Sequence, residues 1–188
     1  MNAATGNHVT NFTIPGIETT QADEIIGILG ERMVATIDLQ LTLKHIHWNV
    51  VGPNFISVHE MLDPQVDAVR EMTDAVAERI ASLGGVPLGT PGSVVERRTW
   101  NDYSLGKASV SEHLGALDVV YTGTNSDHRA AIAQLAQLDP VSEDLLTGHL
   151  AQLEQFQWFV RAHLESAQGT LPTAGIRNEQ EAAQAASG

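Results

Sequence analysis

The chain has 188 residues, a formal net charge of −13 at pH 7 and no cysteine. This length fits one domain with a substantial core, and the lack of cysteine excludes disulfides, thiolate metal sites and cysteine nucleophiles. No apolar run approaches the roughly 20 residues that a membrane span requires, and the first residues lack the basic start of a secretory signal, so we expect a cytoplasmic protein without membrane contact.

The acidic balance disfavours nucleic acid as a partner, because nonspecific affinity for DNA comes from lysine and arginine that neutralise phosphates. Neither end of the chain is a basic arm: the first basic residue is Arg32, and only Arg177 follows Arg161. The charge suits a protein that attracts cations, although solubility through net repulsion explains it equally well.

The apolar spacing predicts long helices from the N-terminal part onward. Residues 1–17 are polar and predict an extended leader. Apolar residues recur at helical spacing from residue 18 to about residue 50, and Trp48 continues this stripe. After the break "VGPN", a second helix is expected from about residue 55 to residue 83, where a Gly-Gly pair gives a normal C-terminal stop.

The second part of the chain follows the same pattern. "VPLGTPGS" predicts a loop, "VVERR" one short helical piece, and the third long helix is expected from about residue 107 to 138. The fourth follows the turn "DPVSEDLL", where Ser142 is a suitable N-cap and Glu143 and Asp144 complement the helix dipole. It runs to about residue 167, and residues 169–188, rich in Ala and Gln, predict a mobile tail.

Four helices of this length, each on the order of 40 Å long, are typical of a four-helix bundle, which we place over residues 18–168. Di-iron bundles usually hold their metal in the core with Glu-x-x-His pairs. No Glu-x-x-His occurs in this chain. We therefore expect any metal site to lie elsewhere.

The second helix offers another set of ligands. His59 and Asp63 lie four residues apart, as do Asp74 and Glu78, so each pair occupies one helical face. The two pairs are about 22 Å apart along the helix axis, whereas ligands lie about 2 Å from their metal. Two copies of the helix packed antiparallel across a two-fold axis bring the pairs together in two equivalent sites. His47 joins from its own chain if "VGPN" folds the first helix back beside the second.

With these residues in place, the chain resembles the Dps family, the DNA-binding proteins from starved cells, and its actinobacterial members in particular. The matching stretches are "LKHIHWNVVGPNFISVHEMLDPQVD", "VAERIASLGG" and "FQWFVRAHLE". The family spaces its ferroxidase ligands as His, twelve on His, four on Asp, eleven on Asp and four on Glu. In this chain the pattern gives His47, His59, Asp63, Asp74 and Glu78, and in the family the last two come from the two-fold partner.

The resemblance implies an all-α, ferritin-like four-helix bundle with a short extra helix between the second and third long helices. It implies a hollow dodecamer built from two-fold dimers, in which Fe(II), two ions per site, is oxidised preferentially by hydrogen peroxide and stored as ferric mineral, protecting against oxidative damage. Trp48 takes the position of the family's Trp beside the site, with a role against oxidants. For the acidic iron-uptake pore we nominate four residues, which helix capping explains equally well: Asp127, Asp139, Glu143 and Asp144.

Three features of the sequence have alternative explanations: the chemistry of the predicted metal site, the proline Pro64 and the remaining histidines. A His and carboxylate metal site also activates water, so a metal-dependent amide or ester hydrolase at the same interface is the enzymatic alternative. Pro64 directly follows Asp63, so the second helix either continues through a kink or begins there, and the resemblance favours a continuous helix. The remaining interior histidines lack paired acids, which favours core or surface roles: His45, His113, His128, His149 and His163.

Overall fold

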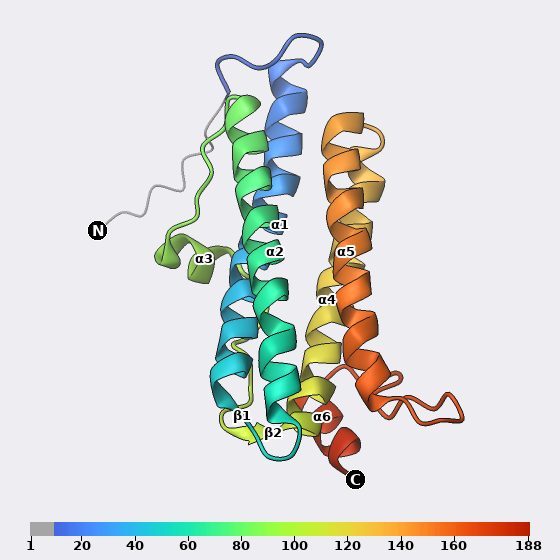
Figure 1. Ribbon diagram of the computed structural model, residues 1–188. Helices are drawn as coiled ribbons and strands as arrows, with labels where there is room; N and C mark the ends of the chain where they lie inside the picture. Colours follow the sequence, from blue (N-terminus) through green and yellow to red (C-terminus); the bar gives the residue numbers. More distant parts are fainter. Residues whose placement is uncertain (1–9) are drawn as a thin grey trace.

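The computed structural model describes residues 10–188 (Figure 1). Residues 1–9 of the expected leader lie outside this range, and residues 10–17 form neither helix nor strand. The described chain includes no helix that is both long and apolar enough to cross a membrane. Its elements are α1 (Thr19–Asn49), β1 (Val50–Val51), α2 (Phe55–Ser82), α3 (Pro91–Arg97), β2 (Ala108–Ser109), α4 (Val110–Leu135), α5 (Pro140–Leu164) and α6 (Glu179–Ser187).

The four long helices form two hairpins, α1 with α2 and α4 with α5, which lie side by side (Figure 1). The predicted all-α four-helix bundle with a short helix between its second and third long helices is therefore confirmed. Its interior holds two apolar clusters, and burial of each large aliphatic side chain stabilises the fold by about 1.5–3 kcal/mol. Their fully buried members include Leu43, Leu62, Leu117 and Leu153 in one cluster and Leu29, Ile80, Leu135 and Leu146 in the other.

A short parallel pairing fixes where α4 begins. The chain returns along the bundle after α2, and Ala108 of β2 pairs with Val50 of β1, directly after α1. A capping box then starts α4: the Ser109 hydroxyl accepts from the Glu112 N–H, and the Glu112 carboxylate accepts from the Ser109 N–H at 2.8 Å. The first turn of α4 therefore lies beside the C-terminal end of α1.

The start of α5 differs from the prediction. Asp139, and not Ser142, is the N-cap, because its side chain accepts from the Val141 and Ser142 N–H groups. Pro140 occupies the first helical position, where its fixed φ suits the helix and its missing N–H costs no bond. The Ser142 hydroxyl instead donates to the Asp139 carboxylate. The prediction of Ser142 as the cap was wrong because it overlooked the proline.

The expected mobile tail was also wrong for its last part, where the structure has helix α6. Asn178 caps α6 through its side chain, and the buried residues Ala182 and Ala183 pack against α4. Gly115 of α4 permits this approach, because a Cβ there would lie 2.5 Å from the Ala182 carbonyl oxygen. Thr173 further ties the preceding segment to Asp118 of α4 with a 2.6 Å hydrogen bond.

Pro64 lies inside α2, which is one helix from residue 55 to 82. The proline removes the N–H that would bond the carbonyl of Glu60. Both residues are exposed, so water can satisfy that carbonyl. The continuous helix keeps His59 and Asp63 one turn apart on the same face.

Candidate metal centre

His47 of α1 and His59 of α2 form a stacked pair with ring centroids 3.6 Å apart and planes inclined by 24°. Each Nδ1 lies 2.9 Å from the main-chain carbonyl oxygen of the other residue. Because a carbonyl only accepts, Nδ1 is the protonated nitrogen of each ring and Nε2 of each neutral ring carries a lone pair. Both rings are thus oriented by their second nitrogen, as in histidines that bind metals.

A tight reversal of the chain creates this pair. Gly52 has a φ of 97° and Asn54 a φ of 63°, values that glycine adopts freely and asparagine tolerates better than most residues. The "VGPN" turn therefore folds α2 back directly beside α1. The expectation that this turn brings His47 to His59 is confirmed.

Asp63 lies next to this histidine pair within the same chain. Its carboxylate lies 3.3 Å from Nδ1 of His47 and accepts a 2.8 Å hydrogen bond from Nζ of Lys44. The Lys44 hydrogen bond, reinforced by the Lys44 charge, holds the pKa of Asp63 below its usual value. The carboxylate therefore stays ionised, the form that binds a cation.

Asp74 and Glu78 lie further along α2 and both are exposed. Within the described residues of one chain, no group of three or more His, Asp or Glu side chains is arranged to hold a metal ion. The structure thus brings together His47, His59 and Asp63 and leaves the other two predicted ligands apart, at a separation of about 22 Å along the axis from His59 to Asp74.

Trp48 follows His47 but points away from the bundle, with 70% of its surface exposed. The prediction that it continues the apolar core stripe was therefore wrong, and Leu41, two turns earlier on the same face, is exposed as well. Phe55 and Ile56 at the start of α2 are also exposed. The apolar side chains of Trp48, Phe55 and Ile56, near the histidine pair, are thus exposed to solvent.

Two of the nominated pore acids occupy different environments. Asp139 is buried, caps α5 and accepts a 2.6 Å hydrogen bond from the Arg79 guanidinium. Burial alone raises its pKa, but the hydrogen bonds from Ser142 and Arg79 hold that pKa below its usual value. The capping explanation therefore holds for Asp139. Asp127 is exposed and lies 3.7 Å from the Arg32 guanidinium.

The two other nominated acids lie in the first turns of α5. Asp144 is exposed and Glu143 is partly buried. Their position complements the helix dipole, and neither carboxylate has a described ion-pair partner. Both remain nominated for the pore on their sequence position alone.

Three of the histidines outside the predicted site have structural partners. His45 bonds the Leu105 carbonyl through Nε2 at 2.7 Å, and His113 bonds the hydroxyl of Tyr103 at 3.0 Å. His163 is exposed on α5, where its Nδ1 meets the Phe159 carbonyl at 2.7 Å. None of these contacts involves a paired carboxylate, as the sequence indicated.

Because His128 is buried, we expect the folded protein to lose stability in mild acid. Burial, reinforced by the charges of Arg32 and His149, lowers its pKa from 6.5 to about 4. As pH falls from 6.5 to 4, the unfolded chain binds a proton at this residue and the folded chain does not, so folding stability drops by up to about 3 kcal/mol. His128→Gln is expected to flatten this decline in urea unfolding at pH 7 and 4.5. The exposed control His163→Gln should leave it unchanged, and an equally steep decline in His128→Gln would contradict the assignment.

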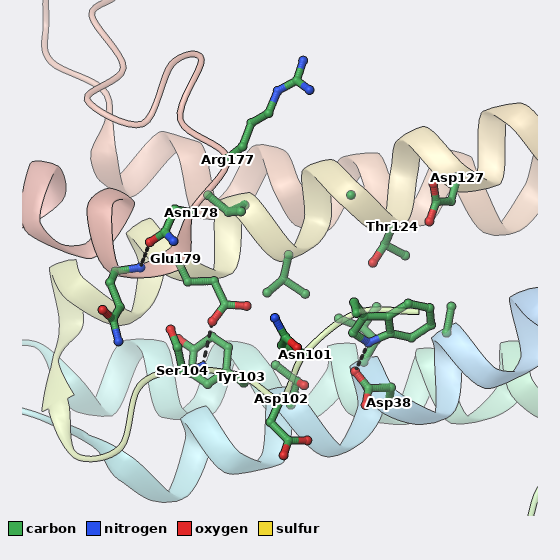
Figure 2. A pocket seen from close by; sticks show the side chains of 18 residues that line it. Asp38, Asn101, Asp102, Tyr103, Ser104, Thr124, Asp127, Arg177, Asn178 and Glu179 are labelled. Atoms are coloured by element: carbon green, nitrogen blue, oxygen red, sulfur yellow. Dashed lines mark hydrogen bonds between the residues drawn. The ribbon is translucent and has the colours of Figure 1, made fainter. Parts of the chain in front are cut away.

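A cavity of about 480 Å³ lies apart from the histidine pair, in the seam between α1 and α4 (Figure 2). The segment 100–104 and the residues before α6 also line it, and there the Ser104 N–H donates to the Glu179 carboxylate at 2.7 Å. Of the predicted site residues, Asp127 alone lines this cavity. Nothing in the sequence indicated the cavity, because the segment 100–104 and the residues before α6, which lie beside the α1–α4 seam, have no periodic pattern.

Comparison with known proteins agrees with this architecture. Residues 26–169 match the ferritin-like domain family. The DNA protection during starvation protein of Mycolicibacterium smegmatis is 55% identical over 175 residues, which cover 93% of this chain and 96% of that protein. The fine tangled pili major subunit of Haemophilus ducreyi is 45% identical over 86% of this chain and 85% of its own length.

Solved structures give the same result. DpsA14 from Streptomyces coelicolor superposes with a TM-score of 0.86 at 62% identity, covering 87% of this chain and 97% of that chain. Mycobacterium smegmatis Dps superposes with a TM-score of 0.87 at 56% identity, covering 88% of this chain and 95% of that one. The chain belongs to the Dps family of ferritin-like proteins.

Proposed function

We propose that the protein is a ferroxidase and iron store. It oxidises Fe(II), preferentially with hydrogen peroxide, at sites between two subunits and retains the ferric product inside a hollow cytoplasmic dodecamer. The observation that carries this proposal is the His47–His59 pair, in which mutual hydrogen bonds leave both Nε2 lone pairs available, next to the ionised carboxylate of Asp63.

The donor set suits iron as a substrate. Imidazole and carboxylate ligands both bind iron, and carboxylate oxygens stabilise the ferric product more than the ferrous reactant. Asp63 is held by Lys44 in the single chain, so binding of Fe(II) requires Lys44 to share or release this carboxylate. Before iron binds, the positive charge of Lys44 thus balances the negative charge of Asp63.

A partner subunit supplies the remaining ligands in this proposal. Positions 59 and 78, and positions 63 and 74, are symmetric about the same point of α2, so one two-fold axis aligns both pairs. Asp74 and Glu78 are exposed and free to face a second copy of α2. The exposed apolar side chains of Trp48, Phe55 and Ile56 supply surface that such an interface can bury.

The chemistry needs two iron ions close to one peroxide. Each Fe(II) gives one electron, and the peroxide takes two electrons and two protons to form two water molecules. Because both electrons arrive together, no hydroxyl radical is released. His47 and His59 orient the ions, and the carboxylates compensate the charge of the ferric product.

Iron uptake follows from charge. The net charge of −13 attracts cations to the shell, and the exposed acids Asp127 and Asp144, with Glu143, are the pore residues we propose. Asp139 is left out, because its carboxylate is buried against Arg79.

The direct test mixes iron-free protein with Fe(II) and peroxide and follows ferric absorbance, together with the native mass and the iron retained after gel filtration. We expect peroxide-dependent oxidation, retained iron and a particle of twelve chains of 20.2 kDa each. Oxidation no faster than in buffer, or a monomer that retains no iron, would contradict the proposal.

Protection of DNA does not require DNA contact in this protein, since removal of Fe(II) and peroxide suffices. We expect no gel retardation of duplex DNA even at low salt, because phosphate neutralisation needs clustered Lys or Arg. A matched positive control adds lysines to exposed positions of α6, as in Gln180→Lys with Gln184→Lys. Retardation of the unmodified protein that weakens with rising salt would overturn this expectation.

A further inference from the structure

The cavity in the seam between α1 and α4 has no part in the proposed iron oxidation. Its volume of about 480 Å³ lies within the range of sites that bind small molecules. Its wall on α1 runs from Ala35 to Thr42, and its wall on α4 runs from Val119 to Asp127. The cavity therefore extends for about 10–12 Å along the helix axes, and a ligand that fills it is elongated.

Two carboxylates lie toward opposite ends of this cavity (Figure 2). At one end, the Glu179 carboxylate accepts a hydrogen bond from the Ser104 N–H at 2.7 Å, and no ion pair of the described chain involves it. At the other end, Asp127 is exposed, and its nearest cation, the Arg32 guanidinium, is 3.7 Å away. Figure 2 shows the Arg177 side chain extending away from both carboxylates. Positive charge is thus attracted at two separate points.

Aromatic side chains line the space between these ends. Trp100 and Tyr103 both contribute to the wall, and the Trp100 indole N–H donates to the Asp38 carboxylate at 2.8 Å. Arg98 donates to the other oxygen of that carboxylate at 3.1 Å, so the charge of Asp38 is already compensated and its role is to fix the indole. Aromatic rings attract cations through their faces and also pack against methylene groups.

Thr42 adds a polar group that lacks a protein partner. It lines the cavity and only 8% of its surface is exposed. The hydroxyl of Thr36, six residues earlier on α1, donates to a carbonyl of its own helix at 3.0 Å, whereas no hydrogen bond found among residues 10–188 involves the Thr42 hydroxyl. A buried hydroxyl without a partner costs free energy. An N–H group of a ligand in the cavity supplies that partner.

We propose that this cavity binds a linear aliphatic polyamine. One terminal ammonium group pairs with Glu179 and the other with Asp127, while the inner ammonium group lies against the aromatic wall. The methylene segments pack along apolar residues such as Leu39. A single metal ion fills little of so long a cavity, and an anion is repelled by the carboxylates at both ends. The inference does not rest on the ferroxidase function, because binding is measured without iron.

The test is isothermal titration calorimetry of the iron-free, full-length protein at physiological salt, with spermidine as the probe. We expect one spermidine per chain. The short diamine 1,3-diaminopropane, which cannot reach both carboxylates, should bind more weakly by about tenfold, the effect of losing one charge-assisted hydrogen bond. Mg²⁺ at the same charge concentration should not displace spermidine. Absence of spermidine binding, or its complete displacement by Mg²⁺, overturns the proposal.

Three variants locate the site. Gly123→Leu fills the cavity, because a Cβ at this wall position of α4 meets no atom within 4 Å, and leucine favours the helix. It should abolish spermidine binding with unchanged helix content in circular dichroism. Glu179→Gln keeps an oxygen that accepts from the Ser104 N–H and should weaken binding by about tenfold.

The matched control is Glu165→Gln, which removes the same charge from an exposed position outside the cavity. This control should bind spermidine as tightly as wild type. Equal weakening by Glu179→Gln and Glu165→Gln would show that the acidic protein only attracts counterions, and undiminished binding by Gly123→Leu would place spermidine elsewhere. Either result overturns the proposal, whether or not the protein oxidises iron.

Discussion

Replacing His47 and His59 together with alanine is expected to slow peroxide-dependent Fe(II) oxidation at least about 100-fold, since loss of even an outer-sphere partner of a metal ligand costs 10–100-fold. The double variant removes both Nε2 donors and the two hydrogen bonds that orient them. Initial rates of ferric absorbance at equal protein concentration measure the effect. Circular dichroism should show unchanged helix content, because the apolar clusters of the bundle are untouched.

The matched control is His163→Ala, which removes an exposed histidine whose ring meets only the Phe159 carbonyl of its own helix. This variant should oxidise iron at the wild-type rate. If the double variant His47→Ala, His59→Ala keeps a rate close to that of His163→Ala, the stacked pair is not the oxidation site.

Arg79→Ala should lower the free energy of unfolding by about 3 kcal/mol, because removing one partner of a buried ion pair leaves an uncompensated charge. The side chains of Arg79 and Asp139 are 14% and 5% exposed, and Arg79 also donates to the Ser142 hydroxyl at 3.0 Å. The pair joins the end of α2 to the start of α5. Urea unfolding at fixed protein concentration measures the loss.

The pH dependence of this loss has a definite sign. The folded pKa of Asp139 is held below its ordinary value of 3.8, so its contribution is present above that value and disappears as pH falls through the folded pKa. The difference between wild type and Arg79→Ala should therefore shrink in strong acid. Arg129→Ala, which breaks the exposed pair with Glu154, should cost no more than about 1 kcal/mol. A similar small cost for Arg79→Ala would contradict the account.

The long helices and the proximity of His47, His59 and Asp63 were predictable from sequence, because their signals are local. Apolar periodicity predicts the helices, and a break of four residues between two helices forces His47 and His59 together. The fixed spacing of His59 and Asp63 then adds the carboxylate, provided that the helix continues through Pro64. Each of these inferences needs only the geometry of a helix and a turn.

The errors came from residues whose role depends on neighbours far along the chain. Trp48 has the character of a core residue, and only the packed bundle shows that its face of α1 is open. Ala182 and Ala183 look like tail residues, because their packing depends on a glycine of α4. The pairing of Tyr103 with His113 joins a loop to a helix and leaves no periodic signal.

The central claim is that one oxidation site takes its ligands from two chains, and subunit mixing tests it most directly. The variants His47→Ala, His59→Ala and Asp74→Ala, Glu78→Ala are each purified, unfolded together in equal amounts and refolded. Each alone should be inactive. In the mixture, random pairing makes half of the dimers mixed, and each mixed dimer has one intact site of two, so about one quarter of the wild-type rate should return. A mixture as inactive as its separate components would show that the ligands do not come from two subunits.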